Sequence, residues 1–476
     1  MAAIDYAKHD GLGLAKLVHH KEVKPIELVD AAIERIERHN PALNAIVWTM
    51  FERAREMAKK KLPDGPFKGV PFLLKDIMGH MEGVPNREGT RLTPNMPSPV
   101  TAELVHRYLA AGLIPLGKTN VPEFGLVPTT ESKLYGPARN PWNVAHSTGG
   151  SSGGSGAAVA SGMVPMAHAN DGGGSIRIPA SACGLVGLKP TRARNPMGPL
   201  VGDIMSGLGI DHIVCRSVRD SAAMLDVTAG PGLGDPYCAP AGPKSWLAEM
   251  RKAPGKLRIA VAMTRFDGSA FHPEVTAATK AAAKLCKDLG HRVEEASPPV
   301  QQEPMIGAFM ALWTSGLAMQ IDMIAAMTGT KPGPKNLEGL TIGLYEAGLK
   351  VTAAQYLGAV LHLQALARQV AAWHERYDVW LTPTLATPPI PIGTIDFDER
   401  DPMKGFGPII DYVPFTALQN ATGQPAINLP LHMTADGLPV GVQFVGHIGA
   451  EALLLQLART IEKAEPWKHR RPSIWD

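Results

Sequence analysis

The chain alternates short apolar runs with helix-length amphipathic segments along most of its length, and this alternation restricts its fold most strongly. Short runs bounded by turn residues are typical of buried strands, and longer segments with a 3.6-residue period are typical of helices. Strands alternating with helices predict an α/β layered fold. The expected strands are 69–77, 113–120, 257–262, 291–295, 379–384, 425–431 and 439–446, and the expected helices are about 273–290, 304–328, 352–376 and 450–464.

No linker or low-complexity stretch divides the chain, so one large domain over residues 1–476 is expected. Its central mixed β-sheet should be covered by helices on both faces. Residues 5–61 read as helices packed on that domain, since Pro25 starts a helical pattern that stops near Asn40-Pro41.

The composition excludes several functional classes. Hydrophobic residues make up 45% and charged residues 19% of 476 positions, which is ordinary for a globular enzyme. The net charge of +3 gives no electrostatic reason to expect nucleic acid or an anionic membrane as a partner. The polar N-terminus and the lack of a run of about 18 apolar residues predict a cytoplasmic protein without a membrane span. The four scattered cysteines predict buried free thiols, with no metal site.

Glycine and serine dominate two segments, 149–162 and 172–175, where tight turns are expected in place of regular structure. Three glycines precede Ser175, and consecutive amides in such a turn could form an oxyanion hole. From the residues alone, a structural turn with a solvated serine is the more common explanation.

Two other motifs point to different functions. GLIPLGKT (112–119) matches the phosphate-loop pattern, but its apolar interior predicts a strand and Pro122 opposes the helix that must follow. GGSSG (149–153) and GSSGG (150–154) match the nucleophile-elbow pattern, yet the preceding residues lack an apolar strand. A non-catalytic nucleotide binder is therefore disfavoured. The nucleophile-elbow match alone does not establish an α/β-hydrolase.

Taken together, the segments resemble the ordered blocks of the amidase signature family. These blocks are GVPFLLKD (69–76), GKTNVPEFG (117–125), NPWN (140–143), GGSSGGSGAAVASG (149–162), NDGGGSIRIPASACGLVGLKPT (170–191) and TGQPAINLP (422–430). The resemblance implies a Ser–Ser–Lys triad with Ser175 as nucleophile, Ser151 as a bridging serine on a cis peptide bond, and Lys75 as the start of the proton relay. It also implies oxyanion donors among Gly172, Gly173, Gly174 and Ser175, with Ser152 nearby.

The chemistry requires a neutral lysine, because a serine hydroxyl is a weak nucleophile unless a base takes its proton. The ordinary lysine pKa near 10.4 forbids that at neutral pH, and burial could lower it to about 7–8. Asp171 and Arg177 are expected to be a structural pair that holds the nucleophile loop. Ser152 and Ser155 are candidates for hydrogen bonds near the relay.

The resemblance implies a hydrolase of carbon–nitrogen bonds, of amide, anilide, carbamate or cyclic amide type, with a small-molecule substrate and no cofactor or metal. GDPYCAP (234–240) and PWKHRRP (466–472) resemble the 6-aminohexanoate cyclic-dimer hydrolase branch of the family. The alternative is the A-type subunit of a glutamine-dependent tRNA amidotransferase, whose nucleophile block usually reads TGGS. A monomer or homodimer is expected.

Two features bear on the pocket. The extra glycine beside Ser175, where the family commonly has threonine, is expected to enlarge or loosen the acyl side. Residues 300–350 and 400–420 are expected to form its walls. Met305, Met310, Trp313 and Met319 could line it, although helical spacing makes core packing the more common explanation.

Overall fold

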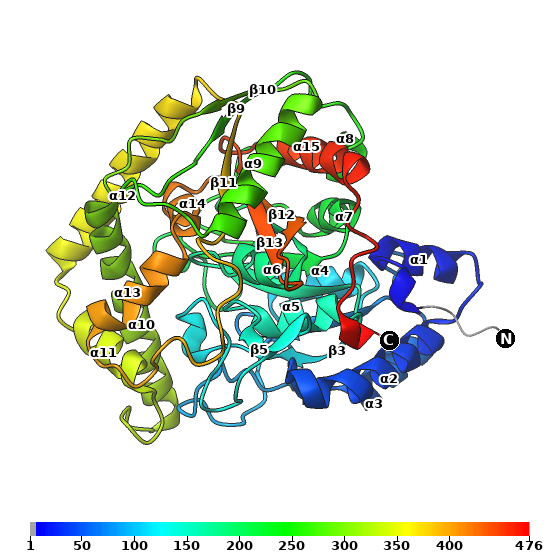
Figure 1. Cartoon of the computed structure of the whole chain (residues 1–476). Coiled ribbons are helices and arrows are strands. Elements are labelled where there is room, and N and C mark those ends of the chain that lie inside the picture. The colour runs from blue at the N-terminus through cyan, green and yellow to red at the C-terminus, as the bar shows by residue number, and fades with distance from the viewer. Residues whose placement is uncertain (1–5, 476) are drawn as a thin grey trace.

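A mixed eight-stranded sheet forms the centre of the computed structural model, which describes residues 6–475 (Figure 1). Residues 1–5 and 476 of the expected single domain lie outside the described residues. Helices cover both faces of the sheet, as predicted. In spatial order its strands are β10 (Arg292–Glu295), β9 (Arg258–Val261), β11 (Val379–Pro383), β13 (Pro439–Val445), β12 (Ala426–Met433), β7 (Val186–Lys189), β8 (Ile210–Cys215) and β6 (Met166–Asp171).

A second sheet of three strands carries the N-terminal part of the site. Its order is β1 (Ile46–Thr49), β3 (Ile114–Thr119) and β2 (Pro71–Lys75). β2 runs parallel to β3, and Leu74 of β2 is opposite Lys118. A two-stranded ribbon pairs β4 (Arg139–Asn140) with β5 (Asn143–Ser147).

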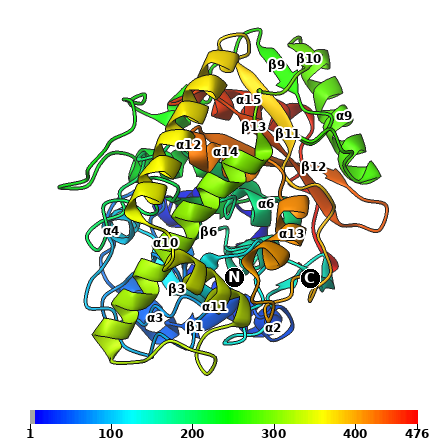
Figure 2. The same cartoon turned by 90° about the vertical axis from the view of Figure 1, so that its left-hand side faces the viewer.

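Helices connect and cover these sheets (Figures 1 and 2). The longest, α10 (Gln302–Thr328) and α12 (Ala353–His374), run side by side along one edge of the molecule. The others are α1 (Gly11–His19), α2 (Pro25–Leu43), α3 (Phe51–Lys59), α4 (Glu103–Ala110), α5 (Gly153–Ala160), α6 (Arg177–Cys183), α7 (Val218–Thr228), α8 (Trp246–Glu249), α9 (Pro273–Asp288), α11 (Gly339–Gly348), α13 (Pro402–Tyr412), α14 (Thr416–Thr422) and α15 (Glu451–Ala464), with short 3-10 turns at Tyr6–Lys8, Glu123–Gly125 and Ser473–Trp475.

The sequence-based assignment holds for the long strands and helices that it named, but it did not predict β6, β7 or β8, and it is wrong in three further segments. β1 lies inside the stretch 5–61 that was expected to be helical. β5 ends just before the glycine-serine segment, where no strand was expected. The third segment is the glycine-serine stretch itself, which forms the regular helix α5 rather than a series of turns.

Close packing explains why a helix this rich in glycine forms at α5. All its residues are buried. A Cβ added to Gly154 would lie 2.3 Å from the Asn120 amide nitrogen, and one on Gly156 would lie 3.2 Å from Cys183 Sγ. The missing side chains therefore let α5 lie directly against the β3 end and α6, and this contact offsets the poor helix propensity of glycine.

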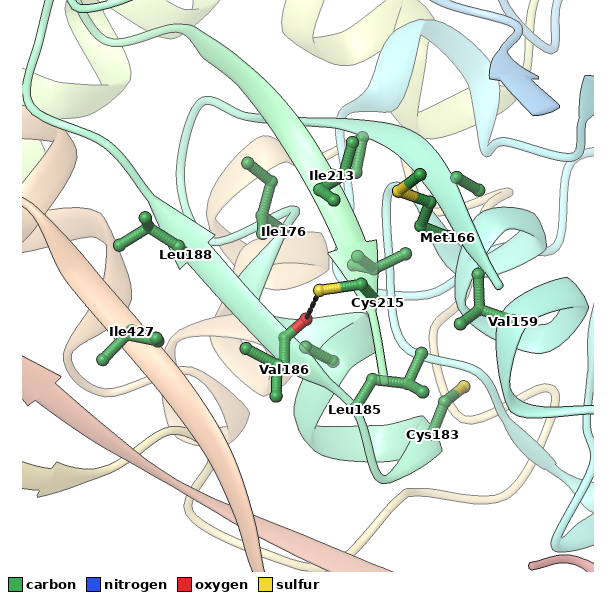
Figure 3. Close-up of a cluster of buried hydrophobic side chains, with 14 of the residues drawn as sticks. Val159, Met166, Ile176, Cys183, Leu185, Val186, Leu188, Ile213, Cys215 and Ile427 are labelled. Carbon is green, nitrogen blue, oxygen red and sulfur yellow. Dashed lines mark hydrogen bonds between the residues drawn. The ribbon is translucent and has the colours of Figure 1, made fainter. Parts of the chain in front are cut away.

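Apolar side chains fill the space between α5, α6 and the strands β6, β7, β8 and β12 (Figure 3). Figure 3 shows this cluster, which includes Val159, Met166, Ile176, Val186, Leu188, Ile213 and Ile427. Cys183 and Cys215 are buried within it as free thiols, and Cys286 is buried elsewhere. Cys238 is exposed, contrary to the expectation that all four cysteines are buried.

The N-terminal segment is held by the rest of the chain. Asp220 of α7 accepts hydrogen bonds from the first two amides of α1, at Gly11 (2.7 Å) and Leu12 (3.0 Å). Arg35 of α2 donates to the backbone oxygens of Ser161, Gly162 and Trp475. These bonds connect both ends of the described chain to the sheet layers.

α10 is also long and apolar enough to cross a membrane, by length and composition alone. The expectation that no such segment occurs is therefore too strict. In the fold, its Leu312, Leu317 and Ile321 are buried against the core.

Candidate active site

Three segments that are distant in sequence meet at one end of β2 and β6. Lys75 is the last residue of β2, Asn170 lies near the end of β6, and Ser151 lies in the loop that leads into α5. The backbone amide of Lys75 donates to His168 Nδ1 of β6, at 3.3 Å, so the two strands lie next to each other. Ser175 follows in the turn between β6 and α6.

Lys75 and Ser151 form a direct hydrogen bond deep in the protein. Lys75 Nζ lies 2.7 Å from Ser151 Oγ and 2.5 Å from Asn170 Oδ1. The Gly150–Ser151 peptide bond is cis, as the family resemblance implies. Lys75 is fully buried and Ser151 is 2% exposed, so water does not compete for this contact.

Burial lowers the pKa of Lys75 to about 7, although the carboxylates of Asp211 and Asp171 favour its charged form. A substantial fraction of the amine is therefore neutral at physiological pH. A neutral amine can accept a proton, which an ammonium cannot.

A buried histidine–aspartate pair lies behind Lys75. His168 Nε2 is 2.8 Å from Asp211 Oδ1. Because His168 Nδ1 accepts from the Lys75 amide, Nε2 carries the hydrogen and donates it to Asp211. The pair fixes the end of β2 from which the lysine side chain projects.

The turn that carries Ser175 is anchored by Asp171. Its carboxylate accepts hydrogen bonds from the amides of Gly174 (2.7 Å) and Ile176 (3.2 Å) and from Arg177 (2.9 Å to each oxygen). Burial alone would raise the pKa of Asp171, but the charge and hydrogen bonds of Arg177 outweigh it and lower this pKa to about 2. The Asp171–Arg177 pair is thus structural, as predicted.

Arg177 extends this anchor to the C-terminal part of the chain. Its guanidinium donates to Gln443 of β13 (2.7 Å) and to three groups of α14, which are the Gln419 and Asn420 side chains and the Thr416 backbone oxygen. Arg177 is fully buried, and each of its three nitrogens has a partner.

The amides of the glycine tract differ in availability. Gly174 already donates its amide hydrogen to Asp171. Within residues 6–475, the amides of Gly172, Gly173 and Ser175 donate to no protein group. Of these, Gly173 and Ser175 line the adjoining cavity.

Ser175 is a buried residue, and its hydroxyl makes no hydrogen bond to any described residue. Gly125 connects the two serines spatially, since it lines the same cavity as Ser175 and a Cβ on it would lie 3.1 Å from Ser151 Oγ. The Lys75–Ser151 contact is therefore formed, while Ser175 lines the cavity.

The remaining polar side chains predicted near the relay also lie there. Ser152 Oγ donates to the Asn170 backbone oxygen at 3.3 Å. Ser155 Oγ donates to the His168 backbone oxygen at 2.7 Å. Both hydroxyls hold β6 in place next to α5.

An apolar cavity that is partly open to solvent lies beside Ser175. Among residues 6–475, no charged side chain lines it, and Gln302 and Ser175 supply its polar side chains. The walls come from the loop 125–128, from α10 and from α13 with the residues after it, which include Met305, Ile306, Phe309, Met310, Trp313, Phe406, Ile409, Ile410 and Val413.

The walls partly match the segments expected from the sequence. Residues 302–313 and 406–417 contribute to the cavity, whereas 314–350 do not. Met305, Met310 and Trp313 line it, and Met305 and Trp313 also belong to the hydrophobic core, with Met310 packed against it. Both interpretations therefore hold for these three residues. Met319 lies outside the cavity and is 56% exposed.

The structure does not support the phosphate-loop match at 112–119. Its lysine, Lys118, lies on β3 and is fully buried, and its Nζ donates to Gly79 O and to Asn86 Oδ1. Both partners are protein groups, so the amine is not available for a phosphate.

Three residues around the Lys75–Ser151 pair were not predicted as site residues, namely Asn170, His168 and Asp211. Asn170 is the first residue of the block 170–191, but nothing in its type marks it as a lysine partner. His168 is one of 16 histidines, and Asp211 becomes its partner only through the pairing of β6 with β8. Among residues 6–475, no group of three or more His, Cys, Asp or Glu side chains is placed to hold a metal ion.

Fold and site together define a layered α/β protein with a buried lysine–serine pair beside a serine on a glycine turn. The family model described as Amidase matches residues 27–455, and the chain belongs to this family of carbon–nitrogen hydrolases. It is 38% identical to the 6-aminohexanoate-cyclic-dimer hydrolase of Paenarthrobacter ureafaciens, over 98% of this chain and 96% of that protein.

Solved structures agree with this assignment. The structure of 6-aminohexanoate cyclic dimer hydrolase complexed with substrate superposes with a TM-score of 0.95 at 37% identity, covering 99% of this chain and 100% of the other. The A-type subunit of the glutamyl-tRNA(Gln) amidotransferase from Thermotoga maritima is more distant, with a TM-score of 0.78 at 27% identity over 98% and 97% of the two chains.

Proposed function

We propose that this chain hydrolyses small, uncharged amides through an acyl-enzyme on Ser175, with Ser151 and Lys75 as its proton relay. The contact between Lys75 Nζ and Ser151 Oγ, at 2.7 Å and shielded from water, is the observation that carries the proposal. The low pKa of Lys75, about 7, supports a role as base.

In the first half-reaction, Ser175 Oγ attacks the amide carbonyl carbon. Its proton passes to Ser151, whose own proton passes to the neutral amine of Lys75. When the tetrahedral intermediate breaks its C–N bond, the proton returns through Ser151 to the leaving nitrogen. Water then attacks the ester in the same way, so that the acid is released and Ser175 regains its proton.

The negative oxygen of the intermediate needs preorganised donors about 3 Å away. The amides of Gly173 and Ser175 suit this role, because both residues line the cavity and neither amide has a partner among residues 6–475. Gly174 is a poorer candidate, since its amide already donates to Asp171.

The cavity favours an uncharged substrate over free glutamine. Glutamine would bring an ammonium and a carboxylate next to Ser175, and burying an unpaired charge is costly. The cavity lining provides no charged side chain for either group. This observation favours a free-standing amidase over a component of an amidotransferase.

The purified chain, without partner proteins or tRNA, should hydrolyse members of a panel of neutral amides, anilides, carbamates and esters. Ser175→Ala should lower kcat by about 10³-fold or more. In the wild-type protein, mass spectrometry should find the acyl group on the peptide that contains Ser175. Ser161→Ala is a matched control, because Ser161 is buried and its hydroxyl donates only to backbone oxygens of its own helix. Undiminished activity of Ser175→Ala would refute the proposal.

A further inference from the structure

Two aromatic side chains of α10 lie directly over the turn that carries Ser175. Phe309 and Trp313 are one helical turn apart, and their rings stack with centroids 5.2 Å apart and planes inclined by 24°. Both line the cavity beside Ser175. Trp313 is 7% exposed, so its ring is nearly enclosed by protein.

The rings fill the space where side chains at positions 172 and 173 would begin. A Cβ on Gly172 would lie 3.1 Å from Trp313 Cζ3, and one on Gly173 would lie 3.3 Å from Phe309 Cζ. Both distances are shorter than ordinary van der Waals contact. The expectation that the extra glycine leaves the pocket larger is therefore wrong here, because aromatic rings occupy the space.

Gly174 is glycine for a different reason. Its φ of +136° is a conformation that side chains rarely adopt, and a Cβ there would lie 2.3 Å from Thr416 Oγ1. Gly172 and Gly173 do not have positive φ values. At these two positions, the close approach of the rings, and not the backbone conformation, disfavours a side chain.

We infer that Gly172 and Gly173 determine substrate specificity by admitting the Phe309–Trp313 pair, which selects a flat aromatic group on the substrate. This inference rests on the proposed amide hydrolysis at Ser175. The other walls are apolar and include Met305 and Met310, whose sulfur atoms suit contact with aromatic rings. An aromatic ring in this cavity could stack on Phe309 or meet the pair edge-on, which an aliphatic group of equal size cannot do.

The first test compares phenyl with cyclohexyl and methyl substrates that are otherwise identical, with the group placed on the acyl side in one series and on the amine side in another. We expect a phenyl preference over cyclohexyl of about fivefold to tenfold in kcat/KM, in one series, from ring contacts. Equal rates for phenyl and cyclohexyl substrates in both series would overturn the inference. Hydrolysis of no amide at all would instead overturn the proposed function.

Variants then locate the origin of the preference. Phe309→Leu and Trp313→Leu keep an apolar wall, and each should reduce the phenyl-to-cyclohexyl ratio to below about twofold. Gly172→Ala should push Trp313 away and lower kcat/KM for the phenyl substrate more than for the methyl one. Gly307→Ala is the control on the same helix, since a Cβ there meets nothing within 4 Å, and it should leave the ratio unchanged.

A binding measurement does not depend on turnover. Ser175→Ala should bind benzamide about fivefold more tightly than cyclohexanecarboxamide in calorimetry, and addition of Trp313→Leu should remove the difference. If variants at 172, 309 and 313 change all substrates by the same factor, these residues affect the fold or the catalytic turn alone, and the inference fails.

Discussion

Replacing Lys75 with methionine removes the buried amine but keeps a side chain of similar length. The low pKa of Lys75 predicts two effects of this change, a pH-dependent gain in stability and a loss of activity. Burial lowers that pKa from 10.5 to about 7. At 1.36 kcal/mol per pKa unit, holding the amine in this environment costs about 5 kcal/mol when it must be charged. The hydrogen bonds to Ser151 and Asn170 stabilise the folded state by about 2 kcal/mol and so offset part of this cost.

The pH dependence of stability follows from the protons bound in each state. Between pH 7 and 10.5 the unfolded chain holds a proton on Lys75 that the folded chain lacks, so wild-type stability rises with pH in this window, by up to about 1.4 kcal/mol per unit. Below pH 7 both states hold the proton and the full cost applies. Lys75→Met should therefore be more stable than wild type by about 3 kcal/mol at pH 6.5. At pH 9 the two proteins should be about equally stable.

Urea unfolding of both proteins at pH 6.5, 8 and 9 measures this difference. Lys280→Met is the matched control, because Lys280 is exposed on α9 and should show no such trend. Activity gives the second readout, since Lys75→Met should be almost inactive while wild-type kcat/KM rises through a midpoint near pH 7. A stability difference that is constant from pH 6.5 to 9 would refute the assignment of Lys75 as a buried, largely neutral amine.

Two further changes test the surroundings of the relay. Asn170→Asp places a carboxylate 2.5 Å from Lys75 Nζ, which should raise the lysine pKa and move the acid limb of the pH–rate profile up by at least about one unit; an unmoved limb would contradict the relay. Arg177→Met leaves Asp171 buried and unpaired, so it should destabilise the fold by about 3–5 kcal/mol in urea unfolding, and a loss below about 1 kcal/mol would show that the anchor is dispensable.

The sequence predicts the long elements well because their periodicity is clear and local. The strand that ends at Lys75, the strand–helix–strand unit from 257 to 295 and the hairpin from 425 to 446 all form as expected. α5 was mistaken for turns because its stability comes from tertiary contact, which glycine permits but which leaves no local signal.

The site shows the same division between local and tertiary information. The blocks around Lys75, Ser151 and Ser175 are readable, since each is a short specific motif. Asn170 and the His168–Asp211 pair are not, because their roles arise from the juxtaposition of β2, β6 and β8. The sequence marks Trp313 only as a possible pocket or core residue and does not mark Phe309 at all, because their stacking becomes visible only in the structure.

The guanidinium of Arg177 connects the turn that carries Ser175 to a part of the chain that is distant in sequence. Lys75, Ser151 and Ser175 all lie within the first 175 residues, which suggests a self-sufficient N-terminal unit. Yet the turn that carries Ser175 is held through Arg177 by the Thr416 backbone oxygen and by side chains of Gln419, Asn420 and Gln443, more than 240 positions away in the sequence from Ser175. During synthesis, the turn that carries Ser175 can therefore gain all its contacts only after β13 has left the ribosome. A chain that terminates before β13 should be inactive.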